Sequence, residues 1–70
     1  MKIVFTGGGS GGHFYPLIAV AEEVNRLAQE EKIASLKLYY FSTEPYNEAL
    51  LFENNLVFKK VISGKLFGLN

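Results

Sequence analysis

A run of glycines ends in the only histidine of the chain. Residues 7–13 read Gly-Gly-Gly-Ser-Gly-Gly-His, so five of the six residues before His13 are glycine. Glycine lets a backbone turn sharply and approach a ligand closely, and a helix that begins after such a loop offers unpaired N–H groups to anions. The run therefore predicts a site for phosphate or diphosphate, the alternative being a glycine-rich turn without a ligand. The residues that we expect to bind the anion are Gly9, Ser10, Gly11 and Gly12.

His13 is the candidate catalytic residue at this junction between loop and helix. An imidazole exchanges protons near neutral pH, so it suits a general base. It equally suits a hydrogen-bond donor to a phosphate oxygen. The alternative is a helix-capping residue that orders the loop. We favour the functional interpretation because of the position of His13 rather than its residue type.

The glycines alone do not identify the kind of phosphate ligand. Gly7, Gly9 and Gly12 match the G-x-G-x-x-G pattern of dinucleotide sites, which is a weak signal by itself. Such sites also need an acidic residue at the end of the second strand. The expected strand ends at Phe41, and Glu44 comes too late. A Walker-type loop is disfavoured because no Lys-Ser or Lys-Thr pair follows the glycines.

Apolar runs and turn residues alternate along the chain in the order β-α-β-α-β. Runs without alternation predict strands covered on both faces, and apolar residues at three- and four-residue spacing predict an amphipathic helix. We expect strands at residues 2–6, 36–41 and 56–62, helices from near Pro16 to Glu31 and from near Pro45 to Glu53, and a loop at residues 63–68.

The two helices carry recognisable boundary residues. Pro16 suits the first turn of the first helix. Ser42 or Thr43 is expected to cap the second helix, with Pro45 in its first turn and Asn54 and Asn55 closing it. The expected apolar stripe of the first helix is Leu17, Val20, Ala21, Val24, Leu27 and Ala28. The aromatic residues expected in the core are Phe14, Tyr15, Tyr39, Tyr40 and Phe41.

This order of elements predicts an α/β fold with a parallel sheet and right-handed crossovers. Two such crossovers in one direction place both helices on the same face, so the other face of three strands is bare. All-parallel sheets are normally covered on both faces. We therefore interpret residues 1–70 as half of a doubly wound domain rather than a complete one. The alternatives are a small autonomous domain and a half-domain completed by another chain.

Composition excludes several classes of function. Seven basic and seven acidic residues give a net charge of +0, which argues against a nucleic-acid partner. The chain has no cysteine, so it has no disulfide and no thiolate metal site, and we expect neither a metal nor a cofactor. The sequence shows no signal peptide and no apolar run long enough to span a membrane. We expect a cytoplasmic protein.

The glycine run and its surroundings resemble the amino terminus of the MurG family of peptidoglycan glycosyltransferases (glycosyltransferase family 28). The shared pattern is a strand, then Gly-Gly-Ser/Thr-Gly-Gly-His, two residues and a proline, found here at residues 8–16. The apolar helix at residues 17–23 and the segments at 51–54 and 63–66 are also similar. The resemblance covers nearly all of the chain, and its motif is more specific than G-x-G-x-x-G.

The resemblance implies the Rossmann-like start of a GT-B two-domain enzyme, with residues 1–70 as part of the acceptor-side domain. The implied reaction is inverting transfer of N-acetylglucosamine from UDP-N-acetylglucosamine to undecaprenyl-pyrophosphoryl-N-acetylmuramyl-pentapeptide (lipid I to lipid II) in peptidoglycan synthesis. It implies a peripheral location on the inner face of the cytoplasmic membrane. Most donor-binding residues would lie beyond Asn70, so this segment alone is expected to be inactive.

Within that reaction, Ser10, Gly11 and Gly12 would contact the nucleotide sugar or the acceptor diphosphate, and His13 would take the proton. Two other functions remain as alternatives. One is a module that binds NAD(P) or FAD. The other is a non-catalytic half-domain that needs a partner chain.

Overall fold

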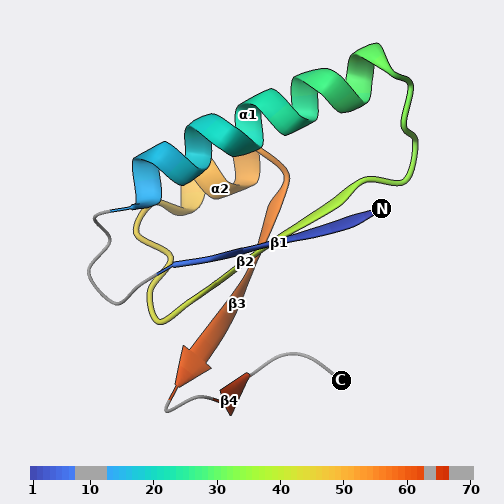
Figure 1. Ribbon diagram of the computed structural model, residues 1–70. Coiled ribbons are helices and arrows are strands. Elements are labelled where there is room, and N and C mark those ends of the chain that lie inside the picture. Colours follow the sequence, from blue (N-terminus) through green and yellow to red (C-terminus); the bar gives the residue numbers. More distant parts are fainter. Residues whose placement is uncertain (8–12, 63–64, 67–70) are drawn as a thin grey trace.

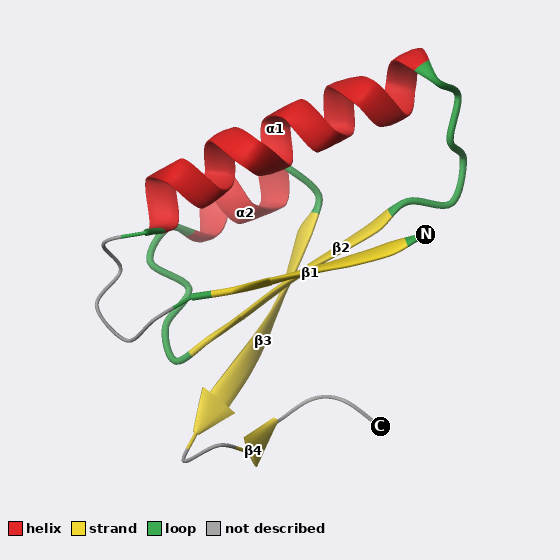
Figure 2. Ribbon diagram, in the orientation of Figure 1, coloured by secondary structure: helices red, strands yellow, loops and turns green. Residues whose placement is uncertain are grey.

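The chain forms one sheet with two helices, as seen in a computed structural model that describes residues 1–7, 13–62 and 65–66. Figure 1 follows the chain through the elements, and Figure 2 separates helices from strands. The elements are β1 (Lys2–Thr6), α1 (Phe14–Glu30), β2 (Lys37–Ser42), α2 (Glu48–Glu53), β3 (Leu56–Ile62) and β4 (Lys65–Leu66). The predicted order β-α-β-α-β is confirmed, and the strands expected at 2–6 and 56–62 have the bounds of β1 and β3.

The sheet has the strand order β1-β2-β3-β4. β1 pairs with β2 in parallel, and β2 pairs with β3 in parallel, so that Val4, Tyr39 and Val57 lie side by side. β4 pairs antiparallel with the end of β3 through Val61 and Leu66. The loop expected at residues 63–68 is therefore wrong at Lys65–Leu66. A strand of two residues is too short to show an apolar periodicity, so the sequence pattern could not predict β4.

Both helices lie on the same side of the sheet, as the two successive crossovers predict (Figures 1 and 2). The side chains of α1 and α2 bury the facing side of the strands. The buried cluster between them consists of Phe14, Ile18, Ala21, Leu38, Tyr40, Leu51 and Leu56. Successive strand residues point to opposite faces, so Leu38 and Tyr40 of β2 and Leu56 of β3 enter this cluster, and Ile3, Phe5 and Phe58 pack against it.

The stripe predicted for α1 is correct in part. Ala21 and Ala28 are buried, but the side chains of Val20 and Leu27 are 52% and 47% exposed. The buried side is centred instead on Phe14 and Ile18. The apolar arc of α1 is wider than the side that this sheet covers, so spacing alone did not locate the contact.

The predicted start of α2 is wrong. Ser42 is the buried last residue of β2, and α2 begins at Glu48 after Asn47, whose side-chain oxygen accepts a 3.0 Å hydrogen bond from the Leu50 N–H. Tyr46 has a positive φ of 61°, which prevents a helix from running on from Pro45. The predicted end is confirmed: Asn54 is the C-cap, and Asn55 adopts the left-handed conformation with a φ of 60°.

The face of the sheet away from the helices is open in the part of the chain that the structure describes. Val4 and Val57 are 53% and 47% exposed, and Tyr39 and Phe41 are half-buried. The bare second face expected from the crossovers is thus present. Of the aromatic residues expected in the core, Tyr40 is buried, whereas Tyr39 and Phe41 belong to the open face. No helix among the described residues has the length and apolar character to cross a membrane.

An amide network joins α1 to the turn between α2 and β3. The side-chain nitrogen of Asn25 donates to the carbonyl of Ala21 (2.9 Å) and to the carbonyl of Asn54 (2.8 Å). The side-chain nitrogen of Asn55 donates to the side-chain oxygen of Asn25 at 3.2 Å. Asn25 lies on the side of α1 that faces the core, so these bonds fix the second half of the helix against the turn.

Asn25→Ala should therefore destabilise the chain. It removes both donated bonds and leaves the half-buried carbonyl of Asn54 without that donor, which costs about 1–3 kcal/mol of unfolding free energy. Urea unfolding followed by circular dichroism measures this change. Gln29→Ala, one turn farther along α1 at an exposed position, is the matched control and should change stability by less than about 0.5 kcal/mol. Equal midpoints for the two variants would contradict the role of Asn25.

Candidate phosphate-binding site

Of the glycine run, the structure describes Gly7, directly after the carboxyl end of β1, and His13 directly follows the run and precedes α1 (Figure 1). The backbone N–H of Gly7 donates a 3.0 Å hydrogen bond to the carbonyl of Phe41, which ties the start of the run to β2. In open α/β sheets, ligands bind outside the carboxyl ends of the strands. The run therefore begins at the edge of the sheet where a ligand site is expected.

Four of the predicted binding residues lie outside the described residues. These are Gly9, Ser10, Gly11 and Gly12. The structure places the two ends of the run, Gly7 and His13, and leaves the assignment of the four residues between them as a prediction.

His13 stands at the N-cap position of α1. Its carbonyl accepts the N–H of Leu17 at 3.1 Å, so its backbone begins the helix. Its side chain is exposed and makes no capping hydrogen bond to the helix. The capping interpretation of the side chain is therefore not supported, and the imidazole is accessible at the carboxyl edge of the sheet.

Aromatic rings pack against the first turn of α1 on the side that faces the sheet. Phe14 is buried, and its ring centroid lies 5.7 Å from that of Tyr40 and 5.7 Å from that of Tyr46. The ring of Tyr15 lies 5.2 Å from Phe14 but is 65% exposed, so the expectation that Tyr15 is a core residue is wrong. Adjacent helical residues point about 100° apart, and only Phe14 faces the sheet. The rings fix the helix end that carries His13.

Tyr40 also limits the space at Gly7. A Cβ atom at Gly7 would lie 2.5 Å from the hydroxyl oxygen of Tyr40 and 3.1 Å from two of its ring carbons. Glycine at this position is thus required by close approach. Sequence reasoning treated Tyr40 as a core residue and missed this contact. The only available signal was that Gly7 and Tyr40 both lie near carboxyl ends of adjacent strands.

The end of β2 bears on the nature of the ligand. Ser42 is buried, and its hydroxyl oxygen lies 3.5 Å from the N–H of Glu44 in a long hydrogen bond. Glu44 itself is exposed in the loop that follows. Dinucleotide sites place an acidic side chain at the end of the second strand, where it binds the ribose. This chain has a buried serine there, which argues against the dinucleotide alternative.

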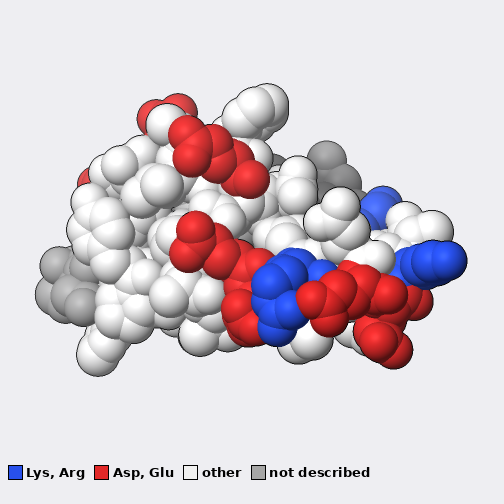
Figure 3. All heavy atoms as spheres, turned by 90° about the horizontal axis from the view of Figure 1, so that it is seen from above, with Lys and Arg blue, Asp and Glu red and all other residues white. Residues whose placement is uncertain are grey.

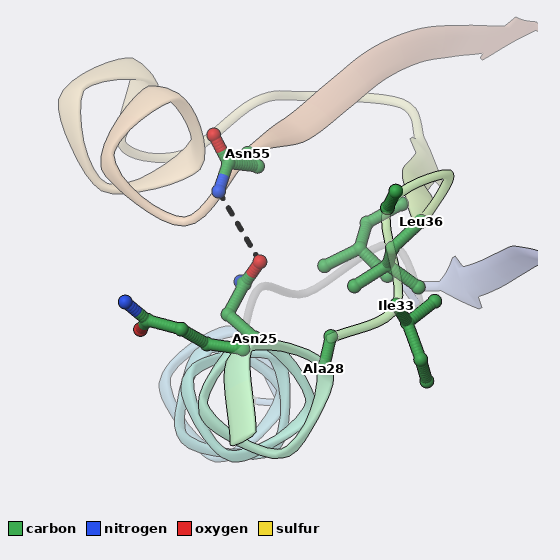
Figure 4. A pocket seen from close by; sticks show the side chains of 8 residues that line it. Asn25, Ala28, Ile33, Leu36 and Asn55 are labelled. Carbon is green, nitrogen blue, oxygen red and sulfur yellow. Dashed lines mark hydrogen bonds between the residues drawn. The ribbon is translucent and has the colours of Figure 1, made fainter. Parts of the chain in front are cut away.

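A cavity of about 420 Å³ lies at the opposite end of the strands (Figure 4). Its wall includes Asn25, Ala28, Ile33, Leu36 and Asn55, and Figure 4 shows the hydrogen bond from Asn55 to Asn25 beside it. The amide network of Asn25 and Asn55 lies at this end of the strands, and the glycine run begins at the other end. We therefore interpret the cavity as a gap in the packing between α1 and the strands, separate from the candidate phosphate site. Among the residues described, no three His, Cys, Asp or Glu side chains gather in a way that would hold a metal ion.

Gly7→Ala should lower the melting temperature because its Cβ collides with the Tyr40 hydroxyl, an overpacking that costs about 1–3 kcal/mol. Tyr40→Phe removes the nearest atom, so the double variant should recover part of the loss. A double-mutant cycle of thermal unfolding measures this coupling. Additive effects of the two substitutions would show that the contact does not restrict Gly7.

The profile of the glycosyltransferase family 28 N-terminal domain matches residues 3–67. No solved structure shows a significant match.

Several curated relatives share the name UDP-N-acetylglucosamine–N-acetylmuramyl-(pentapeptide) pyrophosphoryl-undecaprenol N-acetylglucosamine transferase. The protein from Bacillus pumilus is 41% identical over 66 residues, which cover 91% of this chain and 17% of the relative. The protein from Caldicellulosiruptor saccharolyticus is 34% identical over 80 residues, which cover 91% of this chain and 22% of the relative. The protein from a Thermoanaerobacter species is 62% identical over 24 residues, or 34% of this chain and 7% of the relative.

The chain therefore spans less than a quarter of the length of these relatives. The match of the family profile nevertheless covers almost all of the chain and includes the glycine run, both helices and the three parallel strands. It agrees with the resemblance drawn from the motif at residues 8–16. The chain belongs to glycosyltransferase family 28 and corresponds to its N-terminal domain over residues 3–67.

Proposed function

We propose that this chain is the opening part of the acceptor-side domain of a peptidoglycan glycosyltransferase. The reaction is inverting transfer of N-acetylglucosamine from UDP-N-acetylglucosamine to undecaprenyl-pyrophosphoryl-N-acetylmuramyl-pentapeptide. The observation that carries the proposal is the match of the family 28 profile across a strand, glycine run and helix whose ends lie at the carboxyl edge of a parallel sheet. The names of the relatives supply the donor and the acceptor.

In the proposed reaction, an acceptor hydroxyl attacks the anomeric carbon of the donor sugar. The bond from that carbon to the UDP oxygen breaks, and the hydroxyl proton passes to a base. His13 is our candidate for the base because its imidazole is exposed at the start of α1. Phe14, which follows it, is buried among aromatic rings, so the backbone that carries the imidazole is fixed.

Negative charge on a diphosphate needs hydrogen-bond donors that are already in place. We assign this task to the backbone N–H groups of Ser10, Gly11 and Gly12 and to the hydroxyl of Ser10. α1 begins at Phe14, directly after this stretch in the sequence, and the positive end of its dipole favours the same charge. Gly9 gives the backbone room to approach the diphosphate.

The remaining substrate contacts are proposed to come from parts of the enzyme that this chain does not match. The chain spans 17% of the Bacillus pumilus relative, and a two-domain transferase needs a second domain for its nucleotide. We therefore expect no transfer by this segment alone. Because the proposed acceptor is lipid-linked, the enzyme would work at the inner face of the cytoplasmic membrane.

Activity should depend on His13 and Ser10 in a chimera in which this chain replaces the matching segment of the Bacillus pumilus transferase. His13→Ala should lower kcat by about 10²- to 10⁴-fold, the range for loss of a general base. Ser10→Ala should lower kcat by about 10²-fold, as for loss of one donor to a developing charge. The assay follows labelled N-acetylglucosamine from the nucleotide sugar into lipid-linked product.

Gln29→Ala is the control, because Gln29 is exposed near the far end of α1. It should leave kcat within about twofold of the parent chimera, since surface substitutions away from a site are nearly neutral. Circular dichroism of all variants separates a loss of fold from a loss of chemistry. Full activity of both His13→Ala and Ser10→Ala would remove the proposed roles.

A further inference from the structure

A groove lies on the helix-covered side of the sheet, where α2 meets the first half of β3. Its volume is about 280 Å³, and its lining residues are Pro45, Glu48, Leu51, Phe52, Leu56 and Phe58. The lining includes neither Gly7 nor His13, and neither Val4 nor Val57 of the open face. The groove is therefore a surface distinct from the candidate phosphate site and from the bare face of the sheet.

The floor of the groove is a packed apolar surface. Leu51 of α2 and Leu56 of β3 are buried. Phe58 points to the same face of β3 as Leu56, because alternate strand residues share a face. The ring centroid of Phe58 lies 6.2 Å from that of the buried Tyr40. The core thus holds the floor in place before any partner binds.

Phe52 forms the outer wall of the groove. Its side chain is 84% exposed, the largest exposed fraction of any large apolar residue described. It lies one turn after Glu48, so the two side chains share one flank of α2. Single exposed apolar residues are ordinary, but Phe52 adjoins the floor and makes the apolar surface continuous. Such a surface marks an interaction site.

The size and lining of the groove indicate the kind of group that fills it. Pockets for small molecules measure about 300–1,000 Å³ and combine apolar walls with a few placed polar groups. This groove is smaller, and Glu48 is its only lining residue with a polar side chain. An aromatic or aliphatic side chain of a protein partner fits this lining better, since interface anchors bind in apolar pockets of this kind.

Carboxylates surround the groove. Glu48 lines it, and the exposed residues Glu44 and Glu53 each directly neighbour a lining residue in the chain. Residues 42–58 contain no Lys or Arg. Figure 3, which looks onto the helix side, shows acidic side chains in its upper left with no Lys or Arg beside them. A rim of one sign favours a partner of the opposite sign.

The rim also disfavours two other occupants. A second copy of the chain docked by the same groove would bring carboxylates against carboxylates. An anionic membrane surface would meet the same repulsion. A helix that carries an apolar stripe flanked by lysines or arginines matches both the floor and the rim, in the manner of other helices that bind in grooves.

We propose that this groove binds a basic amphipathic helix of a separate protein. The helix inserts an apolar anchor between Phe52 and Phe58 and places lysines or arginines against Glu44, Glu48 and Glu53. The glycine run and His13 take no part in this contact. The proposal therefore goes beyond the transfer of N-acetylglucosamine and does not depend on it.

A peptide titration of the whole transferase chimera that carries this chain tests the proposal. The probe is a labelled synthetic helix with the one-letter sequence LKKLLKLLKKLLKL, and the control probe has glutamate in place of every lysine. Fluorescence anisotropy should show that the lysine peptide binds and that the glutamate peptide binds at least about tenfold more weakly.

Phe52→Ala should weaken the binding of the lysine peptide by about tenfold or more, as expected for the wall of an anchor pocket. The exposure of Phe52 means that this change leaves the core intact. Leu27→Ala is the matched control, because Leu27 is 47% exposed on α1 and does not line the groove. It should change the affinity less than about twofold.

Removal of one carboxylate gives a second readout that leaves the apolar floor unchanged. Glu48→Gln should weaken the binding of the lysine peptide by about two- to fivefold at low salt and reduce its salt dependence. Glu22→Gln, at an exposed position of α1, should change neither.

Four results would overturn the proposal: no binding of the lysine peptide, equal binding of the two peptides, binding that Phe52→Ala does not weaken, or binding of anionic phospholipid vesicles through Phe52 in place of the peptide. No substrate is present in these titrations, so they bear on the groove alone. A chimera that binds the peptide as expected but transfers no sugar would count against the proposed function alone.

Discussion

Two successive right-handed crossovers between parallel strands determine where the candidate ligand site lies and which face of the sheet is left uncovered. They bring α1 and α2 to one side of the sheet and order the strands β1-β2-β3. The same connections send β1, β2 and β3 in one direction, so Gly7 at the end of β1 and the turn after β2 lie at one edge. A ligand edge and an uncovered face are thus two consequences of one topology.

The candidate site depends on how rigidly that edge is held. Gly7 hydrogen-bonds to the end of β2, and the ring of Tyr40 leaves no room for a side chain at Gly7. On the other side of the run, Phe14 fixes the first turn of α1 against the sheet, while His13 stays exposed. The two ends of the glycine run are therefore anchored, and this suits a loop that must present backbone N–H groups in a fixed arrangement.

The sequence predicted the features that local chemistry controls. The bounds of β1 and β3 follow from dense apolar runs, and Asn55 takes the left-handed conformation expected of asparagine after a helix. Features that depend on distant contacts were missed. The positive φ of Tyr46 delays α2 until Asn47 can cap it, and the exposure of Val20, Leu27, Tyr39 and Phe41 depends on which surfaces other elements cover. At the site, the motif indicated phosphate chemistry, but no pattern indicated that Tyr40 would confine Gly7.

The most direct test of the central claim is a crystal structure of the transferase chimera that carries this chain, with a nucleotide sugar and an acceptor analogue bound. We expect diphosphate oxygens within hydrogen-bond reach, about 2.7–3.1 Å, of the backbone N–H groups at Ser10, Gly11 and Gly12. We also expect the imidazole of His13 beside the acceptor hydroxyl or a phosphate oxygen. Diphosphate groups bound elsewhere, with the glycine run and His13 touching neither substrate, would contradict the account.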